Sequence, residues 1–495
     1  MKRILKSSLL VIIAANALFS CTSGNKIIEQ TAIPFEKLDS LIEIGNLKEA
    51  TNIINQALVF DSLTADQRYK LNFDLDKIER IKGEFNIEKE QMLEYIKKYL
   101  PNVTDTQIDE WIAKRALEAK EIDGKLMFFK KGPHNLFLID SIANKAYVAV
   151  EGEEVETSDF LQKYLPDVIP SLKSSASSYG KGEKMRVTVR MRVFPQAAPS
   201  GEIIRVWLPY IHAQHPKYKD VKLINVYRSD GGSDYLISPG ENLRQSIYFE
   251  MKANGTDTLK VGYTLEFTSY NQYFANLEKN IKPYDTTSTL YKKYTSEREQ
   301  HIIFTPKIRE LTAQVVGEEQ NPYLKVKRIW EYIDKTIPWA GARDYSTIPN
   351  IPMYVLENGH GDCGQVTLLF MTMARIAGVP CKWQSGWMLH PEHLNLHDWA
   401  EVYYEGVGWV PVDQSFGHIG SKENSELYYF YTKGLDAYRY IVNEEYGKEA
   451  PLYPSKIYPH FDEVDFQMGE VEWRGGNIYN GSNGWRCWMD IEYLN

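Results

Sequence analysis

The chain has 495 residues, of which 25% are charged and 13% are aromatic. This length is enough for about three domains, each with its own hydrophobic core. The 57 basic and 66 acidic residues give a net charge of −9, and no basic block stands out, so nucleic acid is not expected as a partner.

The N-terminus has the pattern of an export signal. Lys2, Arg3 and Lys6 precede an apolar run over residues 9–19 that is short for a membrane span. The run ends in L-F-S-C at Cys21 and resembles a bacterial lipoprotein signal. This resemblance implies a signal peptide over 1–20, cleavage before Cys21 and acylation of its thiol. The mature protein is then expected in the cell envelope, lipid-anchored in the periplasm or at the outer membrane. An ordinary secretory signal is the alternative.

A mainly helical domain is predicted over residues 21–170. Apolar residues recur there at spacings of three and four, beginning at Phe35, which is the pattern of a helix with one buried face. Within this region the apolar passage 126–139 is broken at Gly132 and suggests a hairpin.

An all-β domain is predicted next, over residues 180–275. The stretch 171–184 is rich in Ser, Gly and Lys and is a predicted linker. Apolar and polar side chains then alternate over 185–193, and similar runs follow at short intervals. This habit favours a sandwich-like fold.

A third helical pattern begins at Cys363 and ends before Gly378. Asp362 is a predicted N-cap, with Gln365 as its capping-box partner, which places the thiol in the first helical turn. The positive end of the helix dipole favours a sulfur anion there, as a nucleophilic cysteine requires. The residues that define the buried face are Val366, Leu369, Phe370, Met373 and Ile376.

A β-hairpin is predicted over residues 397–413, with its turn at 405–408. His397 and Asp413 then lie opposite each other on neighbouring strands and on the same face; a turn centred one or two residues later makes their contact diagonal. Asp413 can accept the ring proton of His397 and so fix its tautomer.

Three motifs together resemble the transglutaminase-like superfamily of papain-like thiol enzymes. They are G-D-C-G-Q around Cys363, H-D-W-A-E-V-Y at His397 and G-W-V-P-V-D-Q at Asp413. The resemblance covers roughly residues 290–420, and we place the catalytic core at 285–420. It implies an α+β fold, with a helix that bears the cysteine packed on an antiparallel sheet, and a catalytic triad of Cys363, His397 and Asp413 without a cofactor.

The sequence offers candidates for two further sites. An oxyanion hole needs a donor beside the Cys363 amide, and Trp339 in I-P-W-A-G is the candidate; a place in the core is the alternative. His390, His393 and His397 are spaced as H-x-x-H-x-x-x-H, which suits neither one strand face nor the usual zinc pattern, so no metal is expected.

The remaining cysteines are Cys381 and Cys487, either bridged to each other or buried separately. The aromatic-rich extension 421–495 is expected to pack on the catalytic core, with an exposed platform for glycans or peptides as the alternative.

The predicted function is a membrane-tethered cysteine hydrolase, a peptidase or amidase, which cleaves an amide bond through an acyl thioester. Its substrate would be a peptide or protein, with cell-wall peptides among the candidates. A transamidase with the same triad, or a non-catalytic binding lipoprotein of the same fold, are the alternatives.

Overall fold

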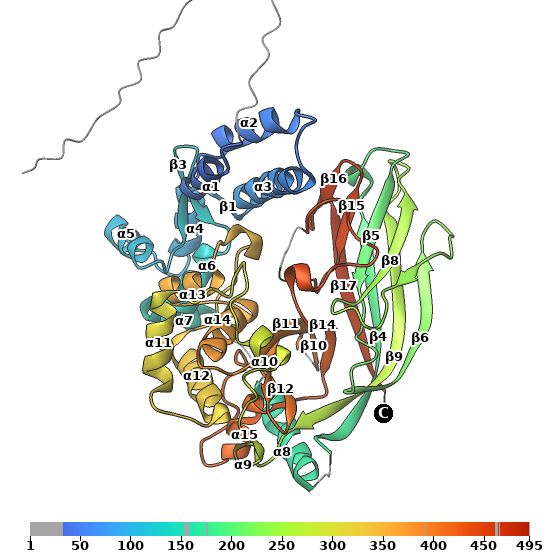
Figure 1. Ribbon diagram of the computed structural model, residues 1–495. Coiled ribbons are helices and arrows are strands. Elements are labelled where there is room, and N and C mark those ends of the chain that lie inside the picture. The colour runs from blue at the N-terminus through green and yellow to red at the C-terminus, as the bar shows by residue number, and fades with distance from the viewer. Residues whose placement is uncertain are drawn as a thin grey trace, which may run out of the picture.

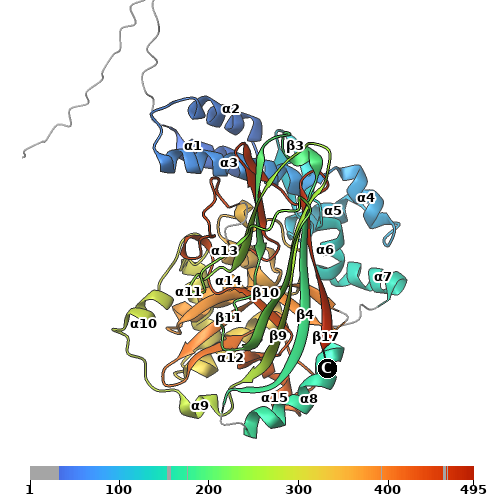
Figure 2. The ribbon, with the colours of Figure 1, turned by 90° about the vertical axis from the view of Figure 1, so that its right-hand side faces the viewer.

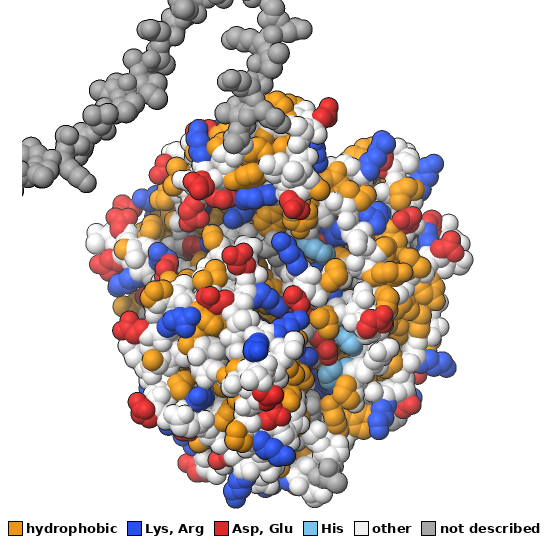
Figure 3. Space-filling view, in the orientation of Figure 1, with side chains coloured by type: hydrophobic (Ala, Val, Ile, Leu, Met, Phe, Trp, Pro, Cys, Tyr) orange, Lys and Arg blue, Asp and Glu red, His pale blue; other side chains and the backbone are white. Residues whose placement is uncertain are grey.

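The computed structural model describes residues 33–152, 158–174, 177–391, 393–460, 464 and 466–494. The predicted signal peptide and Cys21 lie outside these residues. A helical N-terminal part, a layer of core helices and a long twisted β-layer surround the central sheet (Figure 1). Across the described residues, no helix combines the length and apolar character needed to cross a bilayer. On the face drawn in Figure 3, acidic and basic side chains are interspersed.

The N-terminal part is built of short helices around two small cores, and a three-stranded sheet of order β1-β3-β2 joins them. Thr64 and Thr104 each close a capping box with a glutamine three residues on, which fixes where two of the helices begin. The elements are α1 (Phe35–Ile44), α2 (Leu47–Leu58), α3 (Ala65–Glu84), β1 (Phe85–Ile87), α4 (Lys89–Lys97), α5 (Asp105–Ala113), β2 (Ala119–Ile122), β3 (Lys125–Phe129), α6 (Gly132–Ile139) and α7 (Ser141–Glu151).

The predicted hairpin over 126–139 is wrong. The hairpin of this region lies earlier, where β2 pairs with β3, and β3 ends at Phe129. Gly132 then begins helix α6 and does not continue a strand. Pro133 is compatible with the first turn of a helix, where its missing N–H is not needed.

The predicted linker over 171–184 is also wrong in most of its length. Helix α8 (Ser158–Ser174) occupies its first part, and the first sandwich strand begins at Tyr179. The apolar face of α8, which includes Leu161, Leu165 and Leu172, is buried against the sandwich.

The all-β region is a sandwich of two antiparallel sheets, of orders β13-β9-β4-β17 with β6 beside β9, and β16-β15-β5-β8-β7. The predicted strand 185–193 lies inside β4, and its alternate side chains are buried. Figure 2 shows β4, β9 and β17 side by side. The elements are β4 (Tyr179–Val193), η1 (Pro195–Ala197), β5 (Ile203–Pro209), β6 (Tyr218–Arg228), β7 (Leu236–Ile237), β8 (Ser246–Lys252), β9 (Leu259–Tyr273), β13 (Gly434–Leu435), β15 (Glu470–Trp473), β16 (Gly476–Ile478) and β17 (Trp485–Leu494).

The core around α14 packs helices on one face of a four-stranded antiparallel sheet of order β12-β11-β10-β14, and the sandwich covers the other face. This arrangement is the predicted α+β fold. The elements are α9 (Leu277–Asn280), α10 (Thr289–Tyr294), α11 (Pro306–Val316), α12 (Pro322–Thr336), η2 (Tyr345–Thr347), α13 (Ile351–Asn358), α14 (Cys363–Ile376), β10 (Cys381–His390), β11 (His393–Tyr404), β12 (Gly408–Val412), α15 (Ser425–Tyr428), η3 (Phe430–Thr432), β14 (Arg439–Asn443) and η4 (Gly447–Glu449).

The extension 421–495 does more than pack on the core. Its strand β14 pairs with β10 and completes the catalytic sheet. Strands β15 and β17 pair with β5 and β4 and so complete the two sheets of the sandwich. The C-terminal part of the chain therefore belongs to both units.

Candidate active site

Helix α14 begins at Cys363, as its apolar spacing predicts. Oδ1 of Asp362 accepts the backbone N–H of Gln365 at 3.0 Å, and the Gln365 side chain bonds back to the Asp362 amide at 3.3 Å. The thiol is therefore carried at the first position of a capped helix, at the positive end of the helix dipole.

The hairpin of β11 and β12 brings His397 and Asp413 together. Tyr404 pairs with Gly408, so the turn is centred on Gly406, whose φ of 81° suits glycine. This register makes the contact diagonal, and Nε2 of His397 lies 2.8 Å from Oδ2 of Asp413. The predicted pairing of these two side chains is confirmed.

The carboxylate of Asp413 is fully buried and ionised. Burial by itself raises its pKa, but His397 and Arg439 outweigh this effect and hold the pKa of Asp413 below its ordinary value. Nη1 of Arg439 donates to Oδ2 at 2.8 Å. An ionised carboxylate can only accept, so Nε2 of His397 carries a proton, which leaves Nδ1 as the basic atom of the neutral ring.

The thiol of Cys363 bonds to Asp398 and not to His397. Its sulfur lies 3.3 Å from Oδ2 of Asp398, and among the described side chains this is its hydrogen-bond partner. Burial raises the pKa of the thiol well above its ordinary value, and the carboxylates of Asp398 and Asp362 add to the effect. The resting site therefore holds a neutral thiol, against the expectation that the helix N-terminus lowers its pKa.

The glycine after the cysteine makes room for this contact. A Cβ at Gly364 would lie 2.7 Å from Oδ2 of Asp398 and 2.2 Å from the hydroxyl of Tyr345. That hydroxyl donates to Oδ1 of Asp362 at 2.5 Å. A glycine at this position is therefore required for two carboxyl side chains and a phenol to gather around the start of α14.

Aromatic and amide side chains enclose His397. Its ring stacks on Trp399 and meets the edge of Phe416, and Trp399 donates to Oε1 of Gln384 at 2.6 Å. Nε2 of Gln467, from the extension, donates to the backbone carbonyl of His397 at 2.9 Å. His397 as a whole residue is 6% exposed, so little water reaches its imidazole.

Trp339 lies beside the segment that leads to the nucleophile candidate. It forms a parallel bridge with Gly361, and the amide of Ala340 donates to the Gly361 carbonyl at 3.2 Å. The residue is 54% exposed, so its place in the core, the alternative, is excluded. A role in an oxyanion hole stays a prediction.

The other histidine and cysteine candidates have separate places. His390 bonds to Asp436 through Nε2 at 2.9 Å, whereas His397 bonds to Asp413, so the two rings face different carboxylates. Cys381 and Cys487 are free thiols, so they are not bridged to each other.

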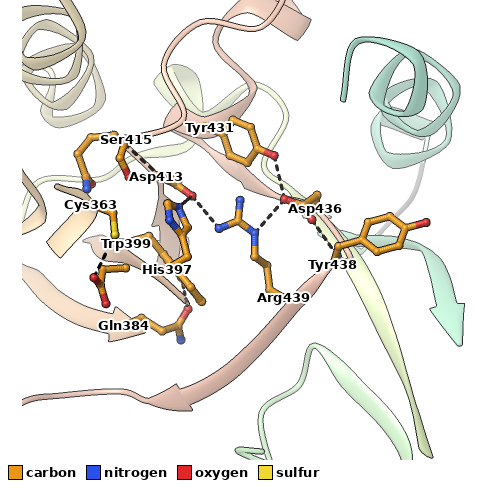
Figure 4. A network of polar contacts seen from close by, with 12 residues as sticks. Cys363, Gln384, His397, Trp399, Asp413, Ser415, Tyr431, Asp436, Tyr438 and Arg439 are labelled. Atoms are coloured by element: carbon orange, nitrogen blue, oxygen red, sulfur yellow. Dashed lines mark hydrogen bonds and ion pairs between the residues drawn. The ribbon is translucent and has the colours of Figure 1, made fainter. Parts of the chain in front are cut away.

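Three residues of this site were missed from the sequence: Asp398, Arg439 and Gln467. Asp398 directly follows His397, and its signal was an acidic residue inside a motif. Arg439 and Gln467 lie in the extension, where no motif marks them. Figure 4 shows the polar contacts that run from Asp413 through Arg439 to Asp436.

A capped helix with a thiol at its start, packed on a sheet that carries a histidine and an aspartate, is the core arrangement that the resemblance to papain-like thiol enzymes implies. Residues 309–414 match the transglutaminase-like superfamily, and this range includes Cys363, His397 and Asp413. Residues 309–414 thus form a transglutaminase-like domain within the chain.

Similar proteins cover parts of the chain. The uncharacterised protein YebA of Bacillus subtilis (strain 168) is 22% identical in an alignment of 130 residues, and the match covers 22% of this chain and 18% of YebA. A candidate cysteine protease from Cytophaga hutchinsonii has a similar structure over 64% of this chain and 92% of its own, at 11% identity and a TM-score of 0.43. The match to the periplasmic domain of TgpA from Pseudomonas aeruginosa covers 54% of this chain and 95% of that domain, at 12% identity and a TM-score of 0.26.

Proposed function

We propose that the chain is a membrane-tethered cysteine peptidase or amidase that cleaves an amide bond through an acyl thioester. The observation that carries this proposal is the 2.8 Å contact of His397 with a buried Asp413 in the same core as Cys363 at the start of α14. These are the three groups that nucleophilic thiol catalysis needs.

The reaction would begin when the thiol leaves Asp398 and turns to His397. Contacts of this kind are often loose before substrate binds. Nδ1 of His397 would take the thiol proton as the sulfur attacks the amide carbon, and the resulting imidazolium would be stabilised by Asp413. The same proton would then pass to the leaving amine, and water would release the acid from the thioester.

The oxyanion of the tetrahedral intermediate would be stabilised at the N-terminus of α14. The backbone N–H of Cys363 is one donor, and the half-exposed indole of Trp339 is the proposed second. The reaction requires no metal or cofactor in this scheme.

The proposal includes a location in the cell envelope, which is inferred from the N-terminal segment. A lipid on Cys21 would hold the enzyme at a membrane of the cell envelope, with its substrate a peptide or protein there, cell-wall peptides included. Radiolabelled palmitate and a Cys21→Ser variant test the anchor; label that persists in the variant would refute it.

Catalysis is tested by offering the purified chain a panel of internally quenched peptides. The wild type should cleave at least one of them, and Cys363→Ala should lose cleavage while keeping its melting temperature. Mass spectrometry of the trapped thioester identifies the acylated residue. Cleavage that survives in Cys363→Ala would refute the proposal.

Two alternatives remain testable. A transamidase would transfer the acyl group to a labelled amine in preference to water, which the same peptides reveal when the amine is added. A non-catalytic binding protein is favoured by one observation, the neutral thiol bonded to Asp398. It predicts no acyl enzyme with any peptide.

A further inference from the structure

The carboxylate of Asp413 is held by more donors than orientation of an imidazole needs. Oδ2 accepts from Nε2 of His397 and from Nη1 of Arg439, each at 2.8 Å. Oδ1 accepts from the backbone N–H and the hydroxyl of Ser415, each at 3.3 Å. The guanidinium and the imidazole thus share one oxygen atom, which ties the charge of Arg439 to the position of His397.

The guanidinium of Arg439 is held between two carboxylates and aromatic rings. It is fully buried, and its Nε donates to Oδ2 of Asp436 at 3.0 Å. Its central carbon lies 4.7 Å from the ring centre of Phe416 and 5.3 Å from that of Trp399. A planar fork can hold two carboxylates in a fixed relation, which an ammonium group cannot do.

Asp436 is itself anchored from three sides. Its carboxylate accepts from Nε2 of His390 at 2.9 Å, from the hydroxyl of Tyr431 at 2.8 Å and from the amide of Tyr438 at 2.8 Å. Asp436 is therefore a fixed support for Arg439 and not a mobile counter-ion (Figure 4).

This support comes from outside the matched domain. Arg439 begins β14, where it pairs with Met388 of β10, whereas Asp413 directly follows β12 at the other edge of the same sheet. The side chain therefore links the two edge strands of the catalytic sheet, and residues 309–414 contain only one end of the link.

We propose that Arg439, supported by Asp436, is a positioning residue for the Cys363–His397–Asp413 site. It keeps Asp413 ionised and in place, so that Nε2 of His397 stays protonated and Nδ1 stays available as the base. The role assigned to Nδ1 rests on the proposed function; the geometry of the link does not.

The first test replaces the guanidinium. In Arg439→Met we expect kcat on the cleaved peptide to fall about tenfold or more while KM changes little. The acidic limb of the pH profile should move to higher pH, because Asp413 loses the guanidinium that helps to keep it ionised. Arg439→Lys keeps a positive charge without the fork, so it should keep the limb and lose part of kcat.

A control variant shows what the loss of an ion pair elsewhere in the fold does. The matched control is Arg298→Met, which breaks a buried ion pair of 2.8 Å with Glu445 away from the triad. It should lower the melting temperature without moving the acidic limb of the pH profile.

Other titratable and charged groups surround Asp413 and Arg439, and their effect on the pH profile must be followed as well. They are His397, His390, Asp436, Lys217, Tyr431 and Tyr438.

A merely structural role has a different signature. If Arg439→Met loses stability as Arg298→Met does but keeps the wild-type kcat and acidic limb, the positioning role is overturned. If Arg439→Met does not fold, Arg439→Lys and Asp436→Asn decide. Both must lower kcat more than they change KM, and unchanged kcat in both overturns the role.

A readout without substrate separates this proposal from the proposed function. Alkylation of Cys363 by iodoacetamide at pH 7, followed by mass spectrometry, should slow about tenfold in Arg439→Met and stay at the wild-type rate in Arg298→Met. A wild type that cleaves no peptide, with this effect intact, would refute only the hydrolase. Equal alkylation rates in wild type and Arg439→Met would refute the positioning role.

Discussion

The thiol of Cys363 donates to Oδ2 of Asp398 across 3.3 Å, and Asp398 is the residue directly after His397. Successive residues of a strand point to opposite faces, so the carboxylate that bonds to the thiol and the imidazole that bonds to Asp413 leave β11 in different directions. The carboxylate of Asp398 therefore retains the thiol proton in the resting site, whereas the proposed base bonds to Asp413.

Asp398→Asn should make Cys363 more reactive. The carboxylate is, after burial, the largest cause of the raised pKa of the thiol, so its removal lowers that pKa. A fall of one unit gives about tenfold more thiolate at a pH below the pKa. The alkylation rate of Cys363 across pH measures this, with the free thiols Cys381 and Cys487 as internal references. An unchanged pH dependence would show that the carboxylate of Asp398 does not raise the pKa of the thiol.

Trp339→Phe should lower kcat about tenfold to a hundredfold with a smaller change in KM, because it removes the N–H proposed for the oxyanion and keeps an aromatic ring. The side chain is half exposed, so the melting temperature should stay within a few degrees of the wild type. A kcat equal to that of the wild type would leave the indole without a part in the chemistry.

Gly364→Ala should destabilise the start of α14 by about 1–3 kcal/mol, since its methyl group would meet the Tyr345 hydroxyl at 2.2 Å. Urea unfolding measures the loss. Combination with Tyr345→Phe removes that hydroxyl and should restore part of the stability. If the double variant is as unstable as the sum of the two single variants, the clash lies elsewhere.

Protonation of Glu470 should destabilise the sandwich at low pH. Burial by itself raises its pKa, but His460 and Lys456 outweigh this effect and lower the pKa to about 2. A lowered folded pKa stabilises the fold above the unfolded value of about 4.3, and this contribution is lost as pH falls towards 2. The free energy of unfolding should therefore drop by about 3 kcal/mol more in the wild type than in Glu470→Gln over that window. Equal drops would contradict the ionised state.

Local geometry allowed the centre of the site to be predicted from the sequence. A capping box and a three-and-four apolar spacing fix the start of α14 within a few residues, and they place Cys363 there. A hairpin has one register once its turn is known, so the diagonal contact of His397 with Asp413 follows from the position of Gly406. Both inferences use neighbours along the chain.

Contacts between distant segments could not be predicted in this way. Arg439 reaches Asp413 only because β14 pairs with β10, and no pattern in the extension reveals that pairing. The contact of Asp398 with Cys363 depends on the space left at Gly364, and that space is set by how the segments pack. The failed hairpin over 126–139 has a related cause, since a short apolar run beside Gly132 suits either a strand or a helix.

Strand β17 pairs along its length with β4, and β14 delivers Arg439 to the proposed triad. During synthesis, a polypeptide that has emerged only as far as Asp413 already contains all three reactive groups. It lacks the guanidinium and the closing strand, both of which come later in the chain. Asp413 therefore acquires its guanidinium partner only after the segment that carries β14 has been made, and β4 acquires its edge partner β17 last of all.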